Sequence, residues 1–375
     1  MGGWYNNLKR TIMKKLAFLN FIFLFFSIAS KGQVIGGTSL SYDSKFSQKG
    51  LFESTEILNI QMKGDFRKIL NDREGEEKYF PVILTYLDKN NKTVSLSIKV
   101  KTRGHFRRQR SNCTFPPLLL RFPAGTGDSS LFPKVSSLKL VMPCRGEEFI
   151  VREWLVYQLY NLITPQSFRA RLVRVNLTDL KNKKMPSPFF GILLEEEKQM
   201  AQRNNMLLVK RKIKPQQTME EPFLRMAVFE YFIGNTDWSV EFLQNIKLIA
   251  ADSVAEAIAV PYDFDLSGIV NSPYAKPAPE LEMTSVRQRR YRGYCIKDMS
   301  LFDSTIAFYN RLKPAIYDLY TNCSLIDEKY KKITIEFFDQ FYSIVNDPKK
   351  LEKEFGYPCN ASGTGNVILK GLRED

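Results

Sequence analysis

The spacing of apolar residues changes near Glu147, from the period of a strand to the period of a helix. Before this point, short runs alternate apolar with polar residues or are bounded by turn residues, which is typical of strands. Two of these runs flank the turn sequence at 88–92 and predict a β-hairpin. The strands expected in this half, and directly after its one helix, are 57–62, 79–87, 93–100, 118–122, 138–142, 171–177 and 189–194.

Helical spacing first occurs at residues 147–163, which precede Pro165. It returns in the second half, where Pro314 is expected to kink or split the helix that contains it. The pattern predicts an α+β protein with a strand-rich first half and a mainly helical second half. The later helices are expected at 221–233, 304–322 and 327–345, with short strands at 245–250 and 257–260.

Residues 1–32 have the pattern of a secretory signal peptide. A short positive segment at Met13–Lys15 precedes an apolar run from Leu16 to Ile28, and small and polar residues follow it. The run is shorter than the roughly 20 residues that a membrane-spanning helix needs. The mature chain is therefore expected to be exported, periplasmic or secreted, with no membrane span after the signal is removed.

The chain is strongly basic, with a formal net charge of +15 at pH 7. Residues 1–32 hold five cations and no acid, so the charge without them is +10. Basic runs occur at 103–110, 210–212 and 287–292. Such runs attract acidic proteins or anionic surfaces, although a solvated basic face is the simpler interpretation. No nucleic-acid motif accompanies them, so no nucleic-acid partner is expected.

One histidine, His105, serves the whole chain of 375 residues. Metal sites that need two imidazoles are therefore excluded, and a Ser-His-Asp or Cys-His enzyme would depend on His105 alone. Five cysteines in an exported chain predict two disulfides and one thiol, with the pairing left open. The five are Cys113, Cys144, Cys295, Cys323 and Cys359.

Polar residues in the segment from Gly234 to Gly268 stand at the ends of predicted elements. Asp237 follows a helix, Asn245 begins a strand, and the next strand ends in Asp263-Phe264-Asp265. Carboxylate and amide oxygens in one place suit Mg²⁺ or Mn²⁺. An Asp-x-Asp at a strand end is also common in turns that have no function. The functional interpretation therefore depends on the order of Asp237, Asn245 and the Asp-x-Asp together.

The same order fits phosphoryl transfer from a nucleotide. A kinase needs a carboxylate that orients or deprotonates the acceptor, and an Asn and an Asp that hold metal ions on the phosphates. On this interpretation Asp237 is catalytic, Asn245 and Asp263 are metal ligands, and Asp265 is a second metal ligand or supports the first. None of these roles needs a histidine.

These segments resemble the spore-coat-protein-H-like (CotH) atypical kinases over roughly residues 50–340. The resemblance implies a two-lobed protein-kinase-like fold, ATP with a divalent metal, and phosphorylation of protein hydroxyls. It divides the chain into a signal peptide (1–32), a strand-rich N-terminal lobe (33–197) and a helical C-terminal lobe (198–375). The segments that carry it are Lys101-Thr102-Arg103-Gly104, residues 138–163, residues 189–195, Gly234-Asn235-Thr236-Asp237-Trp238 with Asn245, and Pro261-Tyr262-Asp263-Phe264-Asp265.

The phosphate-binding lysine departs from the family pattern. Where such proteins often have Pro-Lys-Lys after the Arg-Gly motif, this chain reads Phe115-Pro116-Pro117-Leu118. Lys139 on the strand at 138–142 is the expected substitute, with Glu153 on the following helix as its partner. Arg103 is a further candidate for contact with phosphate.

The sequence thus predicts an exported kinase that transfers the γ-phosphate of ATP to Ser or Thr of an exported protein, or to itself. A binding module without turnover is the first alternative, docking an acidic protein or an anionic polymer on the basic runs around Arg107 and Arg289. A metal-dependent phosphoesterase or nucleotidyltransferase that uses the same carboxylates is the second.

Overall fold

In the computed structural model, residues 50–356 are described, except 77, 89, 124–129 and 133–134. The described residues fall in one compact unit. The predicted signal segment, residues 1–32, and Cys359 lie outside them. Among the described residues, no helix is long and apolar enough to cross a membrane.

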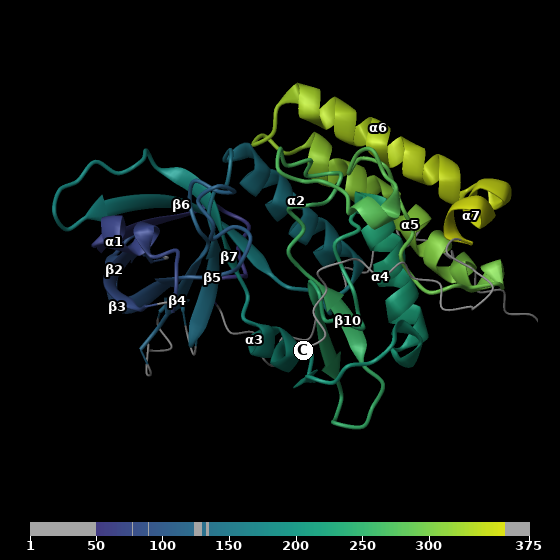
Figure 1. Cartoon of the computed structure of the whole chain (residues 1–375), viewed down its shortest axis with the longest axis horizontal. Coiled ribbons are helices and arrows are strands. Elements are labelled where there is room, and N and C mark those ends of the chain that lie inside the picture. Colours follow the sequence, from purple (N-terminus) through teal and green to yellow (C-terminus); the bar gives the residue numbers. More distant parts are fainter. Residues whose placement is uncertain (1–49, 77, 89, 124–129, 133–134, 357–375) are drawn as a thin grey trace, which may run out of the picture. The chain divides into compact units, whose positions relative to one another are not determined.

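Seven strands of the first half close into a barrel (Figure 1). Around the barrel the order is β1, β2, β3, β4, β5, β7, β6. β1 pairs with β6 in parallel, and all other neighbours are antiparallel. The bounds are β1 Leu58–Gly64, β2 Phe80–Leu87, β3 Thr93–Thr102, β4 Leu118–Arg121, β5 Ser137–Val141, β6 Ala170–Asp179 and β7 Phe189–Leu194.

Alternation along the strands explains the interior of the barrel. In β1, Leu58, Ile60 and Met62 are buried and the residues between them are exposed. Side chains of a strand point alternately to its two faces, so such a strand buries one apolar face. The short helix α1 (Phe66–Asn71) follows β1 and buries Phe66 and Ile69 in the same apolar cluster.

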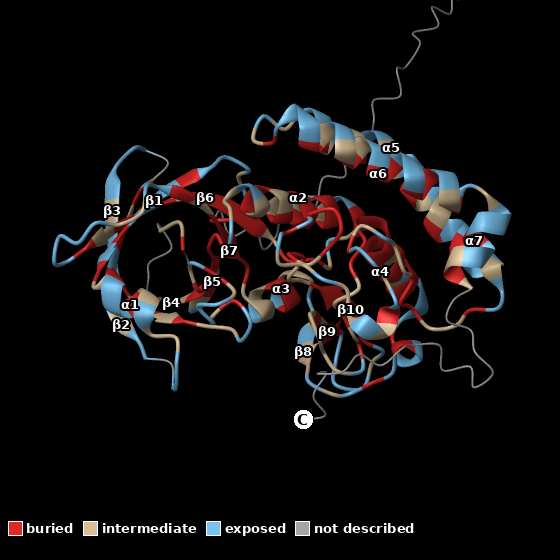
Figure 2. Cartoon of the chain, turned by 45° about the horizontal axis from the view of Figure 1, so that its top comes forward, coloured by how far each residue is buried: buried red, intermediate tan, exposed pale blue. Residues whose placement is uncertain are grey.

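The second half is mainly helical and contains a separate three-stranded sheet in the order β10-β9-β8. α4 is buried along most of its length, whereas α5 and α6 keep one face exposed (Figure 2). The remaining elements are α2 Glu148–Ile163, α3 Glu197–Arg203, β8 Leu207–Val209, α4 Glu220–Ile233, β9 Ile246–Ala250, β10 Ile258–Pro261, α5 Asp303–Thr321, α6 Glu328–Val345 and α7 Pro348–Phe355, with 3₁₀ turns at Pro215–Gln217, Pro279–Leu281 and Met299–Phe302.

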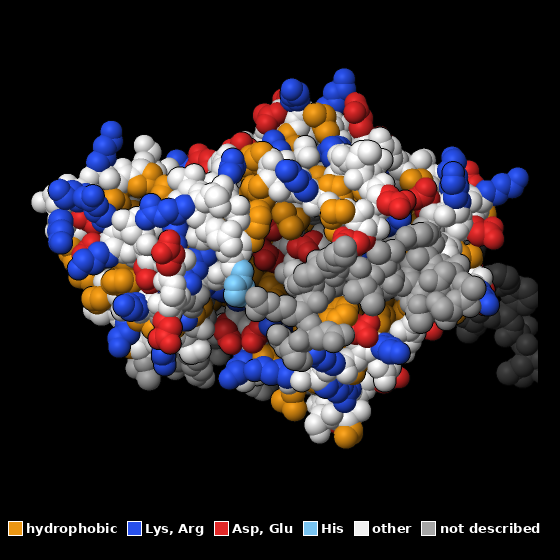
Figure 3. Space-filling view, in the orientation of Figure 1, with side chains coloured by type: hydrophobic (Ala, Val, Ile, Leu, Met, Phe, Trp, Pro, Cys, Tyr) orange, Lys and Arg blue, Asp and Glu red, His pale blue; other side chains and the backbone are white. Residues whose placement is uncertain are grey.

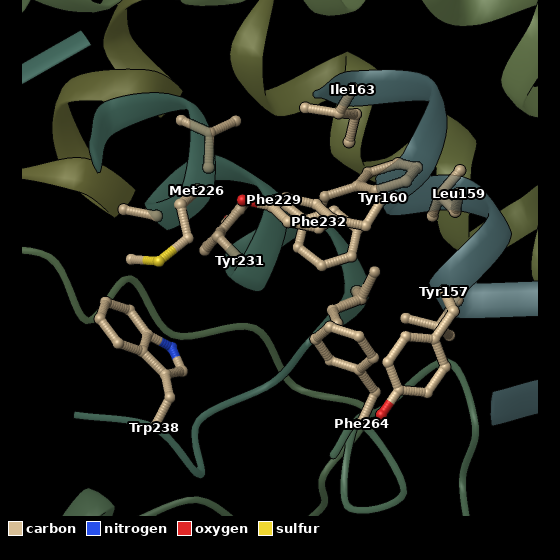
Figure 4. Close-up of a cluster of buried hydrophobic side chains, with 14 of the residues drawn as sticks. Tyr157, Leu159, Tyr160, Ile163, Met226, Phe229, Tyr231, Phe232, Trp238 and Phe264 are labelled. Carbon is tan, nitrogen blue, oxygen red and sulfur yellow. The ribbon is translucent and has the colours of Figure 1, made fainter. Parts of the chain in front are cut away.

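Aromatic rings from α2 and α4 hold the segment that follows β10 (Figure 4). Phe264 packs against Tyr157 of α2 at 4.9 Å between ring centroids and against Phe229 of α4 at 5.6 Å. Such pairs contribute about 0.5–1.5 kcal/mol each beyond their burial. Because Phe264 is fixed in this core, the two aspartates that flank it have defined positions.

The cysteines are used mainly for cross-linking. Cys113 and Cys144 form a disulfide that joins the loop after β3 to the connection between β5 and α2. Cys295 is disulfide-bonded as well. Cys323 is a free thiol.

Most predicted elements are present, including the β2–β3 hairpin, but the barrel is not a feature that the resemblance implied. The architecture that is shown is a mixture of strands and helices, in which the strands of the expected strand-rich part close into a barrel. α5 continues through Pro314 as one helix, so the expected split is absent. α1, α3, β8 and α7 had no counterpart among the expected elements.

Candidate active site

The loop between α4 and β9 positions Asp237 beside Asn245. Gly234 ends α4 in the left-handed region (φ 68°), a conformation that favours glycine. The Nδ2 of Asn245 donates hydrogen bonds to the backbone oxygen of Asp237 at 2.8 Å and to its Oδ2 at 2.9 Å. Gln244 donates a longer bond to the Asp237 Oδ1, at 3.4 Å. Asn245 therefore fixes the Asp237 carboxylate and keeps its own amide oxygen for another ligand.

Asp263, two residues after the end of β10, lies close to this pair. Its backbone has a positive φ of 66°, and its N–H donates to the hydroxyl of the buried Tyr157 at 3.0 Å. Burial raises the pKa of Asp237, and the negative charge of Asp263 raises it further. Asp237, Asn245 and Asp263 thus converge, as their order in the sequence predicts. Asn245 also has a positive φ, of 51°, in the left-handed region that Asn and Asp adopt more readily than other non-glycine residues.

Asp265 occupies a different environment from Asp263, although one residue separates them. Its Oδ2 accepts a hydrogen bond from Tyr274 at 2.9 Å and lies 3.6 Å from the Nη1 of Arg107. Burial raises the pKa of Asp265, and Arg107 opposes that shift. The carboxylate that was predicted as a metal ligand is therefore engaged with protein groups.

Arg107 joins the barrel to the helical half through buried ion pairs. Its Nη1 also lies 3.6 Å from the Oε2 of Glu153 on α2, and its Nη2 donates to the backbone oxygen of Met142 at 3.2 Å. Arg107, Glu153 and Asp265 are 8%, 1% and 6% exposed. The expected Lys139–Glu153 pair is thus wrong: the partner of Glu153 is Arg107, which the sequence interpretation placed in a basic surface run.

Three cations gather beside Tyr262, next to Asp263. The Nζ of Lys139 on β5 lies 4.8 Å from the centre of the Tyr262 ring, and the Nζ of Lys247 on β9 lies 5.6 Å from it. Burial lowers the pKa of Lys139 to about 8, and the positive charges of Arg103 and Lys247 add to this effect. The structure therefore brings the predicted Lys139 and Arg103 together with Lys247.

The sequence interpretation missed Lys247. It forms an ion pair with Glu197 at the start of α3, with Nζ and Oε2 2.9 Å apart. Lys247 stands two residues after Asn245 on a strand with few exposed side chains. A lysine so close to Asn245, on a strand that is otherwise apolar, could have been identified from the sequence as a candidate cation of the site.

The densest basic run, residues 287–292, is used largely inside the protein. The guanidinium of Arg289 lies 3.5 Å from the ring centre of Phe337, and its Nε donates to the backbone oxygen of Phe232. Arg292 is buried and donates to the backbone oxygen of Thr236, beside Asp237. On the face drawn in Figure 3, Lys and Arg side chains are numerous over the barrel, with Asp and Glu among them.

Glu230, on α4 below the Asp237 loop, is fully buried, and burial raises its pKa well above 4.5 against a smaller opposing effect of Asn235. The folded state therefore holds a proton that the unfolded chain releases, so its stability falls as pH rises above about 4.5. We expect Glu230→Gln to raise the free energy of unfolding at pH 7.5 by about 1–3 kcal/mol, with a smaller effect at pH 5. Urea unfolding at both pH values measures this.

The control for this variant is Glu352→Gln, which changes an exposed glutamate of α7. We expect it to leave the pH dependence of stability as in the wild-type protein. An unchanged pH dependence in Glu230→Gln would show that Glu230 is ionised in the folded state.

Comparisons with known proteins identify no family. No family model matches the chain, and no curated protein matches it. Among solved structures, the chain is distantly similar to the proinflammatory kinase CtkA of Helicobacter pylori, with 12% identity and a TM-score of 0.35, over 74% of this chain and 94% of that chain. Similarity at this level is too low to assign a fold or an activity.

Among the described residues there is no group of three or more His, Cys, Asp or Glu side chains placed to hold a metal. A metal ion at this site would therefore be bound by fewer than three carboxylates, together with an amide oxygen and atoms of a bound molecule.

Proposed function

We propose that the chain is an exported kinase that transfers the γ-phosphate of ATP to Ser or Thr of an exported protein, or to itself. One observation carries the proposal. Asn245 holds the carboxylate of Asp237 in place, and Asp263 with its neighbouring cations Lys139, Lys247 and Arg103 lies next to this pair. A base, metal-binding oxygens and cations for phosphate are the parts that phosphoryl transfer requires.

The residues present fit a divalent metal bound together with a nucleotide. The Asp263 carboxylate has no hydrogen bond or ion pair within the described residues, and Asn245 has an amide oxygen left over. Mg²⁺ usually takes one or two carboxylates, with substrate phosphates and water completing its shell. Asp263 and Asn245 would hold such an ion, whereas Asp265 is engaged by Arg107 and Tyr274. The bound ion would neutralise charge on the phosphates.

The cations would hold the phosphates. Lys139 and Lys247 lie over one ring, that of Tyr262, and Arg103 is near enough to lower the pKa of Lys139. Like charges gathered in a half-buried place repel each other, and a phosphate chain would relieve the repulsion. Arg103 and Lys139 come from the barrel and Lys247 from the three-stranded sheet, so the nucleotide would bridge both.

Asp237 would accept or orient the proton of the acceptor hydroxyl. Burial and the neighbouring Asp263 raise its pKa, which makes its carboxylate a better proton acceptor than an exposed aspartate. Arg292, bonded to the backbone of Thr236, and Asn245, bonded to Asp237 itself, keep the loop in position. Such fixed placement is the main contribution of the protein to this reaction.

The resemblance to CotH kinases supports a two-lobed interpretation of this architecture. The barrel would then be the N-terminal lobe, and the part from α3 (Glu197–Arg203) onward the helical C-terminal lobe, close to the predicted boundary at 197/198. The signal-peptide pattern of residues 1–32 supports export.

Calorimetry with ATP and Mn²⁺ tests the proposal. We expect the wild-type protein to bind ATP in a Mn²⁺-dependent manner and Asp263→Ala to lose that dependence. Asp318→Ala, which removes an exposed carboxylate of α5, is the matched control and should bind as the wild type does. Absence of ATP binding by the wild-type protein would refute the proposal.

The pKa of about 8 for Lys139 predicts a pH dependence of ATP binding. Lys139 loses its charge as pH rises through 8, so we expect ATP affinity to fall by up to about tenfold between pH 7 and pH 9. In Lys139→Arg the charge persists at pH 9, and the fall should disappear. Calorimetric titration at several pH values measures the ATP affinity. The control is Lys99→Arg, which changes an exposed lysine of β3 and should keep the pH dependence of the wild-type protein.

A further inference from the structure

A cavity lies outside the site described above, between the loop that follows β3 and the connection from β5 to α2. Its volume is about 480 Å³, which is within the usual range of small-molecule sites. Nine described residues line it; none of them is acidic, and the exposed carboxylate of Glu148 lies beside Gly146, one of the nine. The Cys113–Cys144 disulfide is part of its wall and ties together the two segments that form it.

Two arginines line this cavity and keep hydrogen-bond donors for a ligand. Arg145 donates through Nε and Nη2 to backbone oxygens of Asn112 and Ser111, and Arg110 donates through Nη2 to the Asn71 side chain. These bonds use three of the ten N–H donors that two guanidinium groups carry. The remaining donors form no other hydrogen bond with the described residues. Both side chains are exposed and can reach a ligand from solvent.

A third arginine adds to the positive charge around the cavity. Arg73 donates to the backbone oxygens of Cys113 and Thr114, two of the lining residues. Partial burial lowers the pKa of Arg73, and repulsion from Arg110 lowers it further. Three like charges beside one cavity repel each other, and a bound anion would relieve that repulsion.

The other lining groups suit the rest of a small ligand. The Thr114 hydroxyl makes no hydrogen bond with described residues and can donate to an oxyanion. Phe115 stacks on Phe189 at 5.6 Å between ring centroids, which fixes one apolar wall, and Pro143 adds another apolar surface.

We propose that this cavity binds a phosphomonoester group, held by Arg110, Arg145 and Thr114. The planar guanidinium matches the oxygens of phosphate and forms charge-assisted hydrogen bonds that are stronger than neutral ones. The volume exceeds what a phosphate ion alone would fill, so the group is expected to be carried on a side chain or on a small molecule. Both sources share the chemistry that the cavity recognises.

This site is separate from the proposed nucleotide site and does not depend on it. Lys139, Asp237 and Asp263 are not among the lining residues. The loop that forms the cavity also carries Arg107, whose guanidinium pairs with Glu153 and Asp265.

Titration with a fluorescent peptide that contains one phosphoserine and no acidic residue tests the proposal, without nucleotide. We expect binding to the wild-type protein and to Lys139→Ala, and none of the unphosphorylated peptide. The double variant Arg110→Gln/Arg145→Gln should lose about tenfold or more in affinity, since it lacks both charged donors. Arg311→Gln/Lys329→Gln, which removes two positive charges from exposed positions on α5 and α6, is the charge-matched control and should bind like the wild type.

Arg145 also donates hydrogen bonds to the loop backbone, so its substitution could alter the loop itself. Thr114→Val is a second variant that leaves those hydrogen bonds of Arg145 intact, and we expect it to weaken peptide binding severalfold. Competition identifies the source of the group. Free phosphoserine that competes at the peptide's own concentration indicates a small phosphorylated molecule, and a need for large excess indicates a phosphorylated side chain. Failure of the phosphopeptide to bind, or equal binding by wild type, the double variant and Thr114→Val, would overturn the proposal. Loss of binding in Lys139→Ala would place the ligand in the nucleotide site and also overturn it.

Discussion

Asp237→Asn should lower the rate of phosphoryl transfer about 10²–10⁴-fold, the usual contribution of a general base, while ATP binding stays close to that of the wild-type protein. The amide has nearly the shape of the carboxylate and can still lie beside Asn245, but it cannot accept a proton. Single-turnover transfer rates and calorimetric affinities for ATP, compared between the two proteins, measure the separation of chemistry from binding.

The matched control for this variant is Asp318→Asn, on the exposed face of α5. Its transfer rate and ATP affinity should both equal those of the wild-type protein. A rate for Asp237→Asn within about twofold of the wild type would remove Asp237 from the reaction, and loss of ATP binding would show that its carboxylate holds the metal instead.

Arg107→Ala should destabilise the protein by about 3–5 kcal/mol, because it leaves the buried carboxylates of Glu153 and Asp265 without their cation. Urea unfolding measures the loss. Arg108→Ala is the control in the same loop, since Arg108 donates only to backbone oxygens in the connection between α1 and β2. It should cost less than about 1.5 kcal/mol.

Equal costs for these two variants would contradict the buried network. The triple variant Arg107→Met/Glu153→Leu/Asp265→Asn gives a further check, because Arg107 pairs with both carboxylates. Replacement of a buried set of ionic groups by uncharged residues of similar size is often neutral, so we expect the triple variant to recover much of the stability that Arg107→Ala loses.

The strands and helices could be predicted because their signals are local. The alternation at residues 57–62 and the turn at 88–92 anticipate β1 and the β2–β3 hairpin. Closure of the barrel could not be predicted, because it depends on the parallel pairing of β1 with β6, where Leu58 lies opposite Val173. No local pattern specifies a pairing across so many residues.

In the site, too, residues that lie within one segment could be predicted, whereas contacts between distant segments could not. Asp237, Asn245 and Asp263 lie within one segment, and their order at element ends was enough to predict that they converge. The partner of Glu153 was predicted wrongly because a basic run such as 103–110 carries no sign of which side chain turns inward. Only the packing of α2 against the segment after β10 shows that Arg107 is the buried one.

The alternative of a basic docking surface depended on the runs around Arg107 and Arg289, and Arg107 is buried. Because Arg289 and Arg292 donate to backbone oxygens inside the helical part, their substitution would affect folding before it affected any partner. Other cations lie beside Tyr262 and around the Cys113–Cys144 disulfide.

The most direct test of the proposed activity is transfer of label from ATP. The purified protein is incubated with Mn²⁺ and ATP labelled at either the α- or the γ-phosphate, beside Asp263→Ala and the control Asp318→Ala. We predict label from the γ-position alone, on the chain or on an added protein acceptor, which is lost in Asp263→Ala and kept in Asp318→Ala. Label from the α-position would show nucleotide transfer instead, and absence of label from either position would contradict the assignment of a kinase.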